Sequence, residues 1–151
     1  LKLNTMKKLI LMIVAVSAIL ISCKTNQNVA KTENTLEGSW ELKYITGPRI
    51  AFEGLYPNNV PNITFDLKEN RFSGFNSCNR FTGSFTIDNN KISFQDDKTA
   101  MTMMACQGNG DQVFMSTLPK INSYNMSKDG KTLEFFMVEV AMMRFEKMEK
   151  K

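Results

Sequence analysis

The sequence predicts a mostly β, α+β domain, built as an antiparallel, strongly curved sheet or incomplete barrel of short strands with one short helix covering it. Two observations predict this fold. Apolar and polar residues alternate in many short runs, which Asn, Asp, Gly and Pro residues separate. Only the stretch after Asp111 has the spacing of an amphipathic helix. We therefore expect about seven or eight strands and one helix in a single domain over residues 36–149.

The first half of the domain predicts a strand, a loop and a hairpin. Residues 40–44 alternate between apolar and charged side chains, as a half-buried strand does. Residues 47–62 are rich in Gly, Pro and Asn and predict a loop. Residues 63–67 alternate again, and the turn at residues 69–70 should return the chain as a second strand over residues 71–75.

The second half predicts two further hairpins and a last strand. Residues 83–87 and 91–94 flank an Asp-Asn-Asn turn, whose residues tolerate positive φ. A Lys-Asp-Gly-Lys turn follows residues 124–126 and precedes the nearly all-apolar run 133–138, which is typical of a central strand. Residues 140–145 are expected to form the last strand.

The helix is predicted between the second and third of these hairpins. Asp111 is the expected N-cap, and Val113, Phe114 and Leu118 share one helical face. Pro119 should end the helix, because proline has no backbone N–H to donate and clashes with the preceding turn.

The N-terminal segment predicts export. Lys7 and Lys8 precede a 13-residue apolar run, Leu9 to Ile21, which is short for a membrane span and suits a signal peptide. The run ends at Ser22-Cys23, which resembles a bacterial lipobox. On this interpretation residues 1–22 are a lipoprotein signal peptide, residues 1–5 are an upstream over-extension, and Cys23 carries the lipid. An ordinary signal peptide and an uncleaved anchor are the alternatives.

A lipidated Cys23 would attach the protein to a membrane through its acyl chains. Residues 23–35 are polar without periodicity and predict a flexible tether between the lipid and the domain. Because Lys24 follows the cysteine instead of the aspartate that retains many lipoproteins in the inner membrane, we expect the outer membrane, facing either the periplasm or the cell surface.

Composition excludes several classes of function. Lys2, Lys7 and Lys8 supply most of the formal charge of +4, so the mature part is nearly neutral and nucleic-acid binding is not supported. The chain contains no histidine, which rules out a Ser-His-Asp triad, a Cys-His dyad and a His-based zinc site. We expect no enzyme, no catalytic residue, no metal and no cofactor. The remote enzymatic alternative is a hydrolase using carboxylates such as Asp96, Asp97 and Glu53.

The middle of the chain resembles the META domain, the family of HslJ-like bacterial lipoproteins. Residues 78–85 read Cys-Asn-Arg-Phe-Thr-Gly-Ser-Phe, and residues 102–106 read Thr-Met-Met-Ala-Cys. Met103 stands where the family often has arginine. The matching positions that carry the resemblance, with a structural or a binding role, are Cys78, Asn79, Arg80, Phe81, Gly83, Phe85, Thr102, Met104 and Cys106.

The roles of these residues leave alternatives open. Outside the cytoplasm Cys78 and Cys106 favour a disulfide, with two buried thiols or a catalytic thiolate as alternatives. Asn79 is expected to lock a turn. Arg80 either pairs with a carboxylate such as Asp66, Asp96 or Asp97, which we favour, or meets an anion at a cleft.

Eleven methionines raise the question of copper, because thioethers suit Cu(I). Without histidine and without a recurring methionine spacing, flexible core filler is the better interpretation, also for the cluster at Met101, Met103 and Met104.

The resemblance implies a monomeric, non-enzymatic envelope lipoprotein in stress tolerance or outer-membrane maintenance. Its sheet could hold a hydrophobic ligand or a peptide, with Phe52, Leu55 and Tyr56 as the rim. The alternative is a docking or assembly module for another envelope protein, without a small ligand. The two differ in the exposure of the rim residues.

Overall fold

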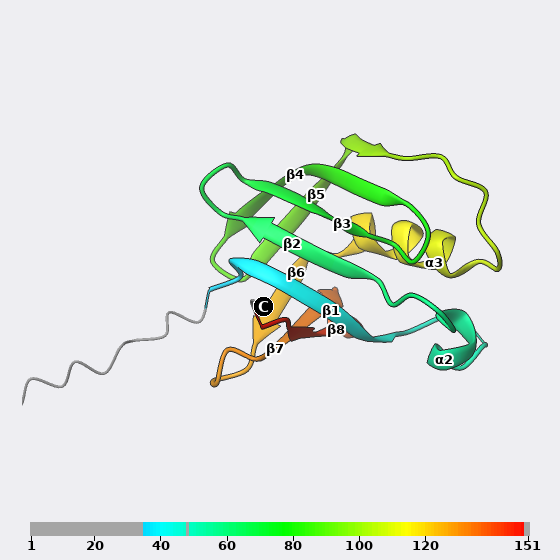
Figure 1. The fold of residues 1–151 in the computed structure, drawn as a ribbon. Helices are drawn as coiled ribbons and strands as arrows, with labels where there is room; N and C mark the ends of the chain where they lie inside the picture. Colours follow the sequence, from blue (N-terminus) through cyan, green and yellow to red (C-terminus); the bar gives the residue numbers. More distant parts are fainter. Residues whose placement is uncertain (1–34, 48, 150–151) are drawn as a thin grey trace, which may run out of the picture. The chain divides into compact units, whose positions relative to one another are not determined.

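The computed structural model describes residues 35–47 and 49–149, and their strands follow one another around a barrel in sequence order (Figure 1). The predicted signal peptide, Cys23 and nearly all of the tether lie outside the described residues. The elements are β1 (Gly38–Ile45), α2 (Phe52–Leu55), β2 (Asn62–Asp66), β3 (Arg71–Phe75), β4 (Arg80–Asp88), β5 (Lys91–Met101), α3 (Gly110–Thr117), the 3-10 turn η2 (Leu118–Lys120), β6 (Ser123–Met126), β7 (Thr132–Met137) and β8 (Val140–Lys147).

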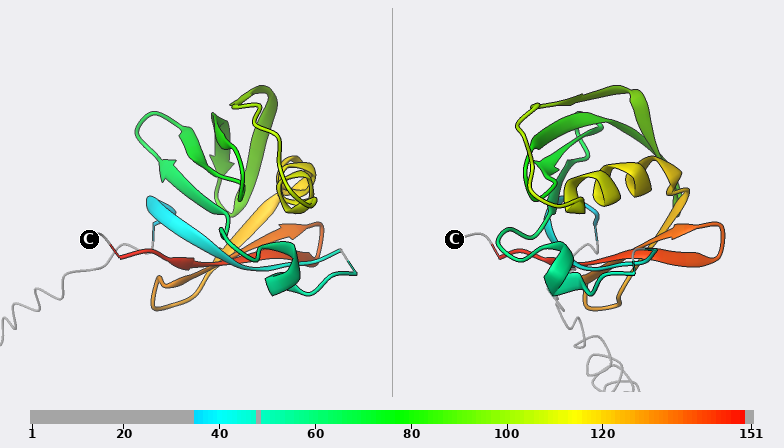
Figure 2. Two further views of the ribbon diagram at one scale, coloured as in Figure 1. Left: turned by 45° about the vertical axis from the view of Figure 1, so that its right-hand side comes forward. Right: turned by 90° about the vertical axis from the view of Figure 1, so that its right-hand side faces the viewer.

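The predicted mostly β fold is confirmed, and the sheet closes. Every strand pairs antiparallel with its neighbour in sequence, and β8 returns to pair with β1. The junction between β5 and β6 is the weakest, with Lys91 opposite Ser123 as its one pair of residues in register. The helix α3 and the turn η2 connect these two strands and cover this side of the barrel, as the end-on view in Figure 2 shows.

Two details of the helical prediction are wrong. The α3 helix begins at Gly110 after Asn109, so Asp111 lies in its first turn and is not the N-cap. There its carboxylate still faces the positive end of the helix dipole. In addition, the loop predicted over residues 47–62 contains the four-residue helix α2. Pro119 lies in η2, immediately after the end of α3, as its chemistry requires.

The strand β5 is longer than the sequence predicts. The prediction ended near Phe94, whereas β5 continues to Met101 and pairs with β4 along both parts. Between the Ser84–Gln95 and Thr82–Ala100 pairs the register shifts, so residues 96–99 form a bulge. The charged residues of the bulge are exposed and break the alternation that would have indicated a continuing strand.

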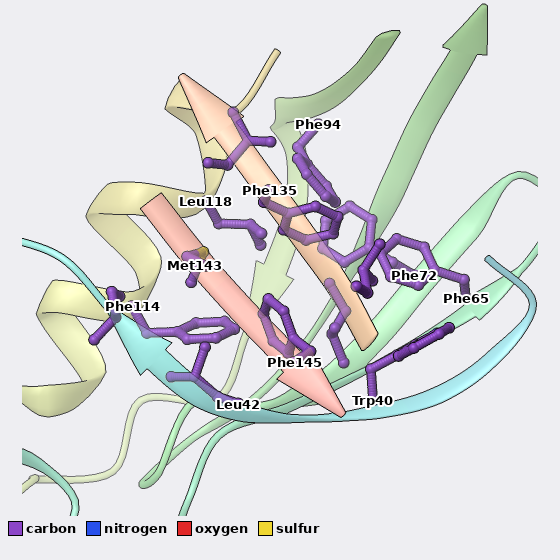
Figure 3. Close-up of a cluster of buried hydrophobic side chains, with 14 of the residues drawn as sticks. Trp40, Leu42, Phe65, Phe72, Phe94, Phe114, Leu118, Phe135, Met143 and Phe145 are labelled. Atoms are coloured by element: carbon purple, nitrogen blue, oxygen red, sulfur yellow. The ribbon is translucent and has the colours of Figure 1, made fainter. Parts of the chain in front are cut away.

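Aromatic side chains fill the interior of the barrel (Figure 3). Phe72 and Phe94 pack edge to face with ring centroids 5.1 Å apart, and Phe135 and Phe145 pack likewise at 5.2 Å. Such contacts add about 0.5–1.5 kcal/mol each beyond the burial of area. The largest fully buried side chains are Trp40, Leu42, Ile63, Phe65, Phe72, Phe85, Phe114, Leu118, Leu133, Phe135, Met143 and Phe145.

The motif residue Gly83 is required by this packing. It lies opposite Phe72 in the pairing of β3 with β4. A Cβ atom at position 83 would lie 2.6 Å from Cζ of Phe72 and 2.8 Å from Oγ1 of Thr99, well inside van der Waals contact. Any larger residue would therefore force the Phe72 ring or the Thr99 side chain to shift.

Candidate functional site

A disulfide joins the turn between β3 and β4 to the segment that follows β5. The structure pairs Cys78 with Cys106, with their Cα atoms 5.8 Å apart. The two residues are 28 positions apart in sequence. A cross-link over that length restricts the unfolded chain and stabilises the fold by roughly 3–4 kcal/mol on the chain-entropy estimate.

The turn before the disulfide is held by Asn76, a residue that the sequence analysis did not single out. Its buried side-chain oxygen accepts the backbone N–H groups of Cys78 at 3.1 Å and Asn79 at 2.7 Å. Ser77, between Asn76 and Cys78, has a φ of 89°, which a free L-residue rarely adopts. The lock expected of Asn79 therefore belongs to Asn76, which the Asn-Ser pair at residues 76–77 could have indicated.

Asn79 instead holds the segment after β5. Its buried side-chain oxygen accepts the hydroxyl of Thr102 at 2.9 Å and the backbone N–H of Met104 at 2.8 Å. Its amide nitrogen lies 3.3 Å from the Met104 carbonyl oxygen and 3.1 Å from Sγ of Cys106. One short side chain thus fixes the backbone of Met104 on both its N–H and its C=O, some 25 residues away in sequence.

Thr102 and Arg80 extend this connection to the start of β4. The backbone N–H of Thr102 donates to the Arg80 carbonyl at 3.0 Å, and the Arg80 N–H donates to the Thr102 hydroxyl at 3.0 Å. The Arg80 side chain is exposed. The ion pair expected from Arg80 to a carboxylate is not formed. Lys43, in contrast, pairs with Glu41 and Glu146.

Residues 101–106, which we call the methionine segment, carry exposed apolar side chains on this fixed backbone. Met103 is 87% exposed and Met104 60%, while Met101 is 38% exposed. The interpretation as core filler is therefore wrong for these three methionines, although it holds for the fully buried Met143. At position 103 an apolar side chain is thus open to solvent.

The prediction that Phe52, Leu55 and Tyr56 form the exposed rim of a ligand site is wrong. Leu55 and Tyr56 are buried, and Phe52 is half-buried against the core. The Tyr56 hydroxyl donates to the Gly110 carbonyl at 3.1 Å, which ties α2 to the start of α3. Burial, with a smaller contribution from the charge of Asp111, raises the pKa of Tyr56 well above its ordinary value, so this hydroxyl stays protonated and remains a donor.

Two hollows in the described part are open to the surface. One of about 880 Å³ is bordered by residues 35, 37–39, 64–66, 131 and 147–149, and one of about 560 Å³ lies over Lys43, Glu134 and Arg144. The hollow between β5 and η2, next to Asp96, holds about 10 Å³, which is room for little more than one water molecule.

The described residues hold no group of three His, Cys, Asp or Glu side chains placed to bind a metal. Within the same residues, no helix is both long and apolar enough to cross a membrane. The carboxylates considered for hydrolysis, Glu53, Asp96 and Asp97, are all exposed.

Together these features define a class of protein: a small, closed antiparallel barrel with a helix over its weakest junction and a disulfide beside a Cys-Asn-Arg-Phe turn. The chain belongs to the META domain family, which it matches over residues 33–149. Among curated proteins no match is found.

Solved structures share the fold at low sequence identity. The NMR structure of a protein from Burkholderia xenovorans has a TM-score of 0.62 at 22% identity and covers 80% of this chain and 88% of its own. A crystal structure of a DUF4847 family protein from Bacteroides vulgatus has a TM-score of 0.53 at 13% identity, covering 77% of this chain and 96% of its own. These similarities extend to the fold alone.

The contacts of Asn79 predict that Asn79→Ala destabilises the domain by about 2–4 kcal/mol, because Met104 N–H and the Thr102 hydroxyl lose a buried acceptor. Urea unfolding measures the change. The matched control is Asn125→Ala, at an exposed position of β6, which should change stability by less than about 0.5 kcal/mol. Equal losses from both variants would contradict the role given to Asn79.

Proposed function

We propose that this chain is a non-enzymatic lipoprotein of the bacterial cell envelope, anchored in the outer membrane through Cys23. Its META domain then acts as a docking module in stress tolerance or outer-membrane maintenance. The composition supports the non-enzymatic part, because without histidine the chain lacks the commonest general base.

The methionine segment is the observation that favours docking to a protein over storage of a small hydrophobic ligand. Side chains fill the described barrel, and the residues expected to form a ligand rim are buried or half-buried in it. Met103 and Met104, in contrast, offer flexible, polarizable apolar groups to the outside. Such side chains adapt to the surface of a protein partner.

The backbone around these methionines is already fixed, which favours binding further. Asn79 and the disulfide hold residues 102–106 before any partner arrives. The entropy that a mobile loop would lose on binding is therefore largely lost during folding. The partner that fits is a protein segment with apolar side chains and a carboxylate, because the exposed Arg80, which is bonded to Thr102 through its backbone, forms no ion pair within residues 35–47 and 49–149.

The anchor is tested by cell fractionation and labelling with a palmitate analogue. We predict that Cys23→Ser abolishes the label and leaves residues 1–22 attached, because the thiol is the acyl acceptor and the cut follows acylation. The control Ser22→Ala keeps a small residue before the cysteine and should stay labelled in the membrane. A Cys23→Ser protein that still takes up the label would rule out this anchor.

Docking is tested by site-specific photo-crosslinking in cells. A photoreactive amino acid at the exposed Ala105, inside the methionine segment, should give one dominant protein adduct, whereas the same group at the exposed Lys68 in the β2–β3 turn should not. Met103→Asp should reduce the adduct on the order of tenfold, because a charge there must be desolvated on binding.

The matched control for this experiment is Met148→Asp, at an exposed methionine outside the segment. It should leave the Ala105 adduct unchanged. Docking through the methionine segment is refuted if Lys68 gives the same adduct in the same yield, or if both aspartate variants reduce it equally.

A further inference from the structure

The methionines of the domain differ sharply in their access to solvent. Met103 and Met104 are the most exposed of those described, and Met148 and Met101 follow at 41% and 38%. Met143 is fully buried, while Met115, Met126, Met137 and Met142 are half-buried. Because oxidation of a thioether follows its exposure, two neighbouring residues stand out as the first targets of a small oxidant.

Local contacts sharpen this order within the methionine segment. The side-chain amide of Asn76 lies 3.2 Å from Sδ of Met101 and donates to it, which engages a lone pair that an oxidant would otherwise attack. In the part of the chain described, the sulfur atoms of Met103 and Met104 accept no hydrogen bond. The fixed backbone at Met104 also keeps these two side chains outside, instead of letting them fold back onto the core.

The remaining sulfur of the domain does not compete for the oxidant. Cys78 and Cys106 are already joined in a disulfide, so they offer no thiolate to a peroxide. A two-electron oxidant that reaches the folded domain therefore meets thioethers as its most accessible sulfur groups.

We infer that Met103 and Met104 form an oxidation site for hydrogen peroxide and related small peroxides, and that its modification switches the docking surface from apolar to polar. The inference rests on the proposed docking function for its consequence, but not for its chemistry. A sulfur lone pair attacks one peroxide oxygen and the O–O bond breaks. That oxygen stays on sulfur as the sulfoxide, and the other leaves as water with both protons. Sulfur loses two electrons and the peroxide gains them.

The product has a defined effect on the surface. A sulfoxide replaces a flexible apolar group by a polar, chiral one. Its oxygen requires hydrogen bonds that an apolar partner segment cannot supply, so burying it in an interface is unfavourable. The disulfide and the contacts of Asn79 involve no atom of these two side chains, so the fold should persist after modification.

The test exposes the folded, exported protein to increasing hydrogen peroxide and follows each methionine by peptide mass spectrometry. Met103 should oxidise first and Met104 next, on the order of tenfold faster than Met143, because reactivity follows exposure. Met101 should lag behind Met148 in spite of their similar exposure, because of its hydrogen bond to Asn76. Oxidation of Met143 or Met148 before Met103, in protein that is still folded, would overturn the assignment.

A readout that needs no partner separates the oxidation site from the docking function. Retention on a hydrophobic interaction column should fall after peroxide treatment in the native protein and in the control Met148→Leu. It should fall much less in Met103→Leu/Met104→Leu, which keeps the apolar surface without these two sulfur atoms, so that only the less exposed methionines remain to be oxidised. A loss of retention in the double variant equal to that of the native protein would refute the inference.

The photo-crosslinking assay then tests the consequence. The Ala105 adduct should decrease after peroxide in the native protein and persist in the double leucine variant. An adduct that persists in the oxidised native protein would refute the switch while docking stands. If no adduct forms even before peroxide, the docking function fails, and the order of oxidation alone decides whether the site exists.

Discussion

The structure depends most on the packing of aromatic rings inside a closed barrel. Phe94 contacts the rings of Phe65, Phe72 and Phe135, and Phe135 in turn contacts Phe145, so that a continuous series of buried rings fills the interior. This packing explains why position 83 is glycine and why α3 places Phe114 against Phe81 and Phe145. Because side chains fill the interior, a ligand or partner would have to bind on the surface of the barrel.

Asn79 holds the connection between β5 and α3 in a defined conformation. The chain between β5 and α3 has no regular hydrogen-bonded partner strand, and a segment of this kind would ordinarily be mobile. The buried amide and the disulfide instead fix it at two neighbouring points, Met104 and Cys106. The Cys-Asn-Arg-Phe turn thus serves a structural role, and the side chains that meet the surroundings are those of the methionine segment.

This arrangement separates stability from recognition. The backbone of Met104 belongs to the hydrogen-bond network of Asn79, whereas its side chain and that of Met103 point to solvent. On the proposed function, substitution or oxidation of these side chains would change docking without removing the contacts that hold the fold. A tether from a lipid at Cys23 would supply the position in the envelope at which such a surface meets its partner.

The strands of the barrel could be predicted from the sequence for two reasons. Period-two alternation shows which face of a strand is buried, and turn residues show where each strand ends. The hairpin at residues 88–91 and the strand at residues 63–67 are of this kind. Prediction from the sequence failed where long-range contacts decide. The three outward methionines look like core residues by composition. The backbone of Met104 is held by the buried side chain of Asn79, a contact across 25 positions that no local sequence pattern shows. The prediction that Phe52, Leu55 and Tyr56 form an exposed rim was wrong in the opposite direction. An apolar loop sequence does not show whether its side chains pack inward.

The most direct measurement of the central claim is native-state hydrogen exchange at the backbone amide of Met104, in protein with the Cys78–Cys106 disulfide formed and the methionines unmodified. If Asn79 holds the methionine segment as a preformed surface, this amide should exchange on the order of 100-fold more slowly than in an unstructured chain, because its N–H is donated to a buried oxygen. Exchange of the Met104 amide at the free-chain rate, while the barrel strands remain protected, would show that the segment is mobile and would contradict the account.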